Sequence, residues 1–184
     1  RAINVALILS NKINYADKLN VLNIDYHNTW SLTFHTLKLL INLGFNLKLL
    51  NFIILFVCLF MSGVGIFLIS KTLSDNLFVS FCIACFIIIT NINFGNLDYP
   101  VLLISEHTNG MSGQACAVLF FGLIADKKIN SAILLSVATL GIHIIIGAWL
   151  IAILFLSIFF FKEKNLKMNF FEKKNIYYLL VIFA

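Results

Sequence analysis

The stretch GIHIIIGAW, residues 141–149, lies in the middle of the longest apolar run of the chain, residues 129–161. One helix over the whole run would be about 50 Å long at 1.5 Å per residue, against a hydrocarbon core of about 30 Å. Glycines weaken a helix, and lipid accommodates an imidazole poorly. The run therefore predicts two shorter helices, about 129–142 and 144–161, that meet at His143.

Composition places the whole chain in a membrane. Of its 184 residues 61% are hydrophobic and 11% are charged, whereas soluble domains carry about a quarter charged residues. The expected fold class is an all-α, polytopic bundle of transmembrane helices. One proline and nine glycines leave little room for linkers, so residues 1–184 are expected to form a single membrane domain. Because the chain starts at Arg1 and ends inside an apolar run, we expect a fragment of a longer protein.

The other apolar runs give the remaining organisation. Spans are expected over about residues 47–70, 77–92 and 111–125, with a truncated span at 176–184. Residues 10–46 precede them as an outer interfacial segment. Within it, apolar residues recur at helical spacing over 29–46, as in a helix that lies in the membrane interface. Ser31 is placed to cap the start of this helix, and Gly44 to end it.

Lysine placement predicts the sidedness, because cytoplasmic loops carry the excess of Lys and Arg. Five lysines lie in 162–175 and two in the turn 126–128, whereas 93–112 has none. If both lysine-bearing segments are cytoplasmic, the run between them crosses twice and turns on the outer side at GIHIIIG. This arrangement also explains the net charge of +5, so we expect the lipid bilayer and no nucleic acid as partner.

On this topology all four histidines fall on the outer side together with three carboxylates: His27, His35, His107, His143, Asp25, Asp98 and Glu106. Polar groups near membrane depth tend to mark functional cavities. A carboxylate and an imidazole at the membrane edge serve as base, acid, metal ligand or phosphate contact. The plainer alternative is that outer loops simply need polar residues. No H-x-x-x-H spacing occurs, so a divalent cation is possible but its ligands are not identified.

Two interpretations of His143 stay open at this stage. It is either a packed histidine bonded to a neighbouring carbonyl, or it faces an outer cavity and binds a phosphate or relays a proton. The four cysteines, all in apolar runs, are expected to pack as small buried hydrophobes: Cys58, Cys82, Cys85 and Cys116.

The run GQACAVLFFGLIADKKINSAILLSVATLGIHIIIGAWLIAILFLSIFFF, residues 113–161, resembles the membrane core of GT-C-type multispanning glycosyltransferases. It has a short helix of small residues, a tight basic turn, a Gly/Ala-rich helix ending in a histidine, and a further span. The resemblance implies short and broken helices, an extracytoplasmic active site and inverting transfer from a polyprenyl-phosphate-linked sugar. It also implies an acidic residue on an outer loop as base or metal ligand. The acidic pair that many of these enzymes carry after their first span does not occur here as Asp-Asp, Asp-Glu or Glu-Asp, and only isolated Asp25 can stand in for it.

Together with the placement of the histidines and carboxylates on the outer side, the resemblance leads to Asp25 and Glu106 as candidate catalytic residues. The candidate substrate contacts are His27, His107, His143 and Asp98. We expect a multi-pass protein of the bacterial inner membrane, in envelope polysaccharide or glycoconjugate assembly. The alternatives are a transporter or flippase of envelope precursors, which also uses glycine-broken helices, and a non-catalytic membrane protein.

Overall fold

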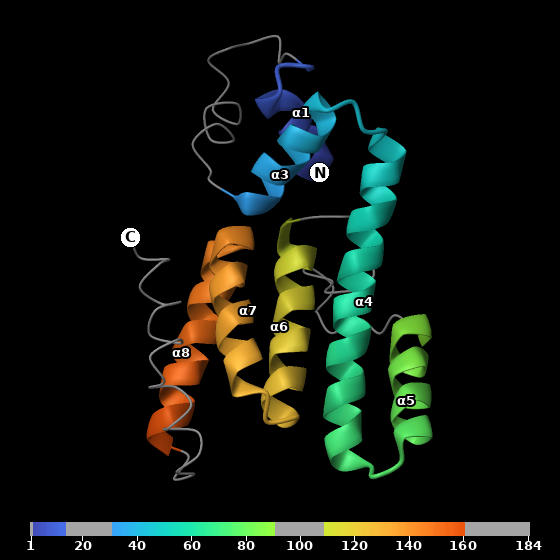
Figure 1. The fold of residues 1–184 in the computed structure, drawn as a ribbon, viewed down its shortest axis with the longest axis vertical. Helices are drawn as coiled ribbons and strands as arrows, with labels where there is room; N and C mark the ends of the chain where they lie inside the picture. Colours follow the sequence, from blue (N-terminus) through green and yellow to red (C-terminus); the bar gives the residue numbers. More distant parts are fainter. Residues whose placement is uncertain (1, 14–30, 91–108, 161–184) are drawn as a thin grey trace, which may run out of the picture.

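The computed structural model describes residues 2–13, 31–90 and 109–160, and all regular structure in these residues is helical (Figure 1). The expectation of an all-α fold is confirmed for this part of the chain. The helices are α1 (Ala2–Leu9), α3 (Leu32–Asn42), α4 (Leu47–Leu73), α5 (Leu77–Thr90), α6 (Asn109–Ala125), α7 (Ile129–Ile142) and α8 (Ile144–Phe160).

The helices form a bundle with a cap at one end. Helices α4, α6, α7 and α8 stand side by side, α5 folds back along α4, and α1 and α3 lie across the top in the view of Figure 1. A buried cluster of α1 and α3 side chains joins Leu50 near the start of α4. We call this end the α3 end, and the opposite end, with Lys71 and residues 126–128, the lysine end.

One described helix is long and apolar enough to cross a membrane by itself. Helix α4 has 27 residues, a rise of about 40 Å. Four further apolar helices, α5 to α8, have 14 to 17 residues and rise about 21 to 26 Å. These lengths fall about 4 to 9 Å short of the ~30 Å hydrocarbon core.

The end of α3 is built as the sequence indicates. Gly44 has φ +87°, a conformation that glycine adopts without steric cost. Its N–H donates to Ile41 O at 3.1 Å, and the N–H of Phe45 donates to Leu40 O at 3.1 Å, which is the pair of bonds of a Schellman motif. Asn46 then starts α4, because its side chain accepts from the N–H of Lys48 at 2.8 Å.

Glycines set how closely the bundle helices approach. A Cβ on Gly65 of α4 would lie 2.5 Å from Val118 O of α6, and one on Gly122 would lie 2.6 Å from Gly65 O. A Cβ on Gly147 of α8 would overlap the backbone nitrogen of Leu140 in α7. Backbones in contact at these points are typical of small-residue helix interfaces.

Candidate functional site

The bundle is interrupted at His143, where α7 ends and α8 begins. His143 has extended backbone angles, φ −149° and ψ 98°, but its N–H still donates to Thr139 O at 2.7 Å. Its carbonyl accepts from the N–H of Gly147 at 2.9 Å, so α8 restarts at once. The two helices then run antiparallel, with α7 and α8 side by side in Figure 1.

Two side chains replace the backbone hydrogen bond that a continuous helix would make from Ile146 to Ile142. The Ile142 carbonyl accepts from Ser31 Oγ at 3.0 Å. The N–H of Ile146 points to His143 Nδ1 at 3.4 Å, a long contact in the geometry of an N-terminal cap. His143 is therefore the N-terminal capping residue of α8. This differs from the first interpretation of His143, in which the imidazole bonds to a neighbouring carbonyl.

Ser31 does not act as the sequence suggested. It occupies the N-cap position of α3, but its side chain makes no capping bond there. The hydroxyl is only 2% exposed and donates instead to Ile142, which joins the start of α3 to the end of α7. The physical reason is that a helix break inside the bundle leaves a carbonyl that needs a donor.

The half-buried imidazole of His143 packs against the first turns of α6. A Cβ on Gly113 would lie 3.1 Å from His143 Cβ, so the absence of a side chain at Gly113 makes room for this histidine. Acceptance at Nδ1 assigns the neutral ring to the Nε2–H tautomer. Nε2 has no hydrogen-bond partner among the described residues, so it offers an N–H donor at the α3 end.

A cavity of about 400 Å³ lies next to this break, between α3, α4 and α6. Ile142 forms part of its wall, and the other lining side chains are mostly apolar. Its polar and sulfhydryl side chains are Thr33, Thr36, Cys58, Ser112 and Cys116.

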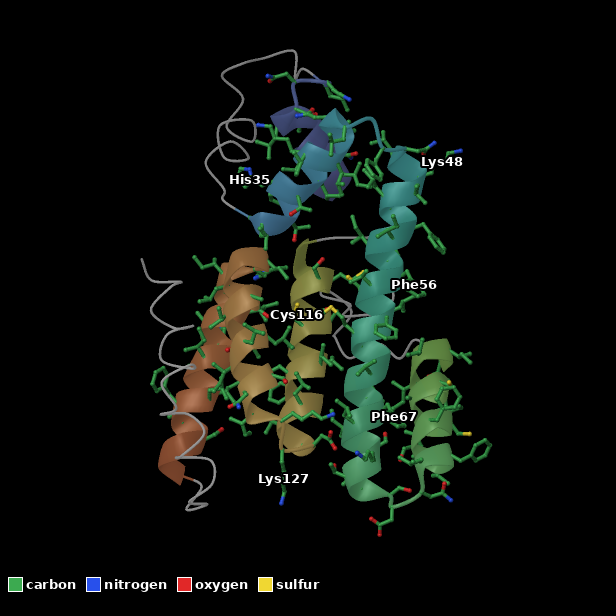
Figure 2. All side chains as sticks on the ribbon, viewed as in Figure 1. His35, Lys48, Phe56, Phe67, Cys116 and Lys127 are labelled. Atoms are coloured by element: carbon green, nitrogen blue, oxygen red, sulfur yellow. The ribbon has the colours of Figure 1, made fainter. Side chains whose placement is uncertain are left out.

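Five of the six predicted site residues lie outside the described residues: Asp25, His27, Asp98, Glu106 and His107. The described chain resumes after them at Ser31 and at Asn109, and both points lie at the α3 end (Figure 1). His35 is exposed on α3 at this same end, opposite to Lys127 (Figure 2). No described group of three or more His, Cys, Asp or Glu is placed to hold a metal ion.

The lysine end holds an ionic cluster that the sequence analysis did not single out. Asp126 Oδ2 lies 2.8 Å from Lys128 Nζ, and Oδ1 lies 2.9 Å from Lys71 Nζ. Hydrogen bonds from Lys128, and next from Lys71, lower the pKa of Asp126 below its ordinary value. The cluster ties the C-terminal end of α4 to the α6–α7 turn, so its role is structural.

The cysteines divide into two pairs. Cys58 and Cys116 are buried as expected, whereas Cys82 is exposed and Cys85 half-buried. The expectation of burial is wrong for Cys82, because α5 packs along α4 and turns its other face outward.

Within the described ranges, the protein is all-helical, with one helix of membrane length and a polar break at its α3 end. Comparison of the chain with protein-family models, with curated proteins and with solved structures finds no match in any of the three.

Proposed function

We propose that the chain is a multi-pass protein of the bacterial inner membrane that transfers a sugar from a polyprenyl-phosphate donor at the outer face. In this proposal α4 to α8 lie in the bilayer as a GT-C-like bundle, and the lysine end faces the cytoplasm. The observation that carries it is the break at His143. The junction of α7 and α8, which holds the His143 imidazole, lies at the α3 end (Figure 1), opposite to Lys127 (Figure 2).

The surface of the short helices supports their place in lipid. Ile144 and Trp149 of α8 are 70% and 67% exposed, and Phe86 of α5 is 64% exposed. Large exposed apolar side chains are unfavourable in water and favourable against acyl chains. Helices of about 21 to 26 Å require the bilayer to thin locally by about 4 to 9 Å, at a cost of fractions of a kcal/mol per Å of mismatch.

The chemistry at the α3 end supports an anionic lipid-linked donor. The Nε2–H of His143 is a donor for a phosphate oxygen, and the polyprenyl chain would remain in the adjacent bilayer. Asp25 or Glu106 would take the proton of the acceptor hydroxyl or hold a divalent cation, as the resemblance to GT-C-type enzymes implies. His27, His107 and Asp98 would contact the donor or the acceptor. These five residues flank the described segments that begin at the α3 end.

The direct test is sugar transfer by the full-length protein in lipid nanodiscs. Polyprenyl-phosphate-linked monosaccharides serve as donors. Asp25→Ala and Glu106→Ala are each expected to abolish transfer, whereas the exposed Asp75→Ala, between α4 and α5, should leave it unchanged. Unaltered transfer by both acidic variants would overturn the proposal.

Variants of His143 separate its capping role from a substrate role. Serine caps helices well but has no imidazole donor. His143→Ser is therefore expected to keep the stability of the wild type within about 0.5 kcal/mol and to lower transfer, whereas His143→Ala costs about 1 kcal/mol as well. Labelling of His143→Cys from the outer side alone supports the enzyme. Labelling from both sides supports a transporter.

A further inference from the structure

The cavity of about 400 Å³ beside the break at His143 follows one stripe of α4, starting next to α3. Its lining residues on α4 recur at intervals of three and four, so they share one face of the helix: Leu50, Ile53, Ile54, Val57, Cys58 and Met61. From Leu50 to Met61 the helix rises about 16 Å. The cavity is therefore elongated in the direction of the α4 axis.

The cavity opens on the outer surface of the bundle and ends at a buried floor. At its rim, Leu32 of α3 and Ile53 and Val57 of α4 are 46%, 42% and 46% exposed. At its floor, Leu50 and Cys116 are 1% exposed. A ligand can therefore enter sideways between α3 and α4 while every described helix stays folded.

The polar groups of the floor already have partners inside the protein. Ser112 Oγ lies 3.8 Å from Cys58 Sγ, and the Cys116 thiol is hydrogen-bonded to Thr139 of α7. The rest of the lining is mostly apolar. A polar ligand group placed there would lack hydrogen-bond partners, which is unfavourable in an apolar environment. The lining therefore selects an apolar chain.

The position of the cavity along α4 identifies the source of such a chain. Helix α4 is the described helix of membrane length, and the lining stripe begins at Leu50, three residues after its first residue. With α4 across the bilayer, the stripe runs from the interface at the α3 end about halfway through the ~30 Å hydrocarbon core. The acyl chains of one leaflet run in the same direction over the same depth. Water is a poor occupant, because an apolar cavity gives it no polar partners.

We propose that this cavity binds one acyl chain of a membrane phospholipid, whose headgroup lies at the level of α3. The chain supplies the packing contacts that the side chains of an empty cavity lack. The inference rests on the part of the proposed function that places α4 in the bilayer. It does not depend on sugar transfer or on His143.

Photo-crosslinking of the full-length protein locates the chain. The probe is phosphatidylcholine with a diazirine near the middle of one acyl chain, in phosphatidylcholine nanodiscs, and mass spectrometry maps the adducts. Adducts are expected on Cys58, which is 4% exposed, so that lipid outside the cavity does not reach it. Phe56 is the reference for that outside lipid, because it is 58% exposed and lies close to the level of Cys116 (Figure 2).

The two positions separate this proposal from the proposed function. Adducts on Phe56 without adducts on Cys58 would overturn the lipid site and leave α4 in the bilayer. Adducts on neither residue would overturn both the lipid site and the placement of α4 in the bilayer.

Variants at the walls of the cavity test its occupancy. In Val57→Trp the indole is expected to fill the mouth, which abolishes the adducts on Cys58 and keeps those on Phe56. Val79→Trp is the matched control, since Val79 is 41% exposed on α5 and does not line the cavity. Thr33→Phe narrows the cavity from α3 and is expected to have the same effect as Val57→Trp without a change in α4. Wild-type adducts on Cys58 in both cavity variants would contradict the site.

Unlabelled polyprenyl phosphate distinguishes the two kinds of lipid chain. Added as a minor component of the nanodisc, it is expected to leave the adducts on Cys58 unchanged, because phospholipid is in large excess. Loss of these adducts would show that the cavity selects a polyprenyl chain, and it would overturn the assignment to a phospholipid.

Discussion

Along one pair of helices, α4 and α6, the half toward the lysine end and the half toward the α3 end are packed in different ways. Near the lysine end, Gly65 and Gly122 bring the two backbones into contact. Near the α3 end, the same helices border a cavity of about 400 Å³, and Cys58 and Ser112 face each other there. Helix α4 leans away from α6 in this direction (Figure 1).

The difference follows from side-chain size and from what closes each end. Without a Cβ at the contact point, α4 and α6 touch, and the Lys71–Asp126–Lys128 cluster holds their nearby ends together. Toward the α3 end, a layer of cysteine, serine and methionine side chains separates the helices. There α3 closes the bundle through Ser31 and its contact with Ile142. The lysine end is therefore closely packed, whereas the α3 end borders a cavity.

The largest effect is expected where the backbones touch. In Gly65→Ala the new methyl would lie 2.5 Å from Val118 O, which must move, so we expect a loss of about 1–3 kcal/mol in the free energy of unfolding. Gly63→Ala is the matched control, because its methyl would meet only the terminal Cδ1 of Ile88, at 2.9 Å. Detergent-titrated unfolding measures both. Equal stabilities would show that the close contact of α4 and α6 does not matter for the fold.

An intermediate effect is expected at the α3 end. Ser31→Ala leaves the Ile142 carbonyl without its donor, at a cost of about 1 kcal/mol. Ser157→Ala is the control, since that hydroxyl donates to Ile153 O within its own helix. The same unfolding titration compares the two variants. A loss of unfolding free energy no larger for Ser31→Ala than for Ser157→Ala would show that the bond to Ile142 does not stabilise the contact of α3 with the bundle.

The smallest effect is expected at the lysine end. Asp126→Asn removes both ion pairs, and pairs with exposed lysines contribute at most about 1 kcal/mol each. Because folding lowers the pKa of Asp126, its contribution is complete above the ordinary value of 3.8 and disappears as the pH falls through the folded-state pKa. Thermal unfolding of wild type and Asp126→Asn should therefore differ at pH 6 and converge in strong acid. A difference that grows in acid would contradict this assignment.

The local features of the chain were accessible from its sequence. The length of the run 129–161 and the flanks of His143 indicated a junction, and α7 and α8 meet there. Gly44 marked the end of α3. Ser31 was recognised as a residue of a helix start, but its partner is 111 residues away. The predicted contacts of Asp25, His27, Asp98, Glu106 and His107 stay predictions, since these residues lie outside the described chain.

Periodicity and apolar length by themselves predicted that the chain is helical, as its described residues are, and that the long run 129–161 breaks near His143. These properties depend on each residue and its neighbours within a few turns. Only the tertiary structure decided that the Ser31 hydroxyl donates to the Ile142 carbonyl and that α4 and α6 touch at Gly65 and Gly122. Each of these depends on which faces of distant helices meet. Such contacts are properties of packed pairs of helices and not of either helix alone.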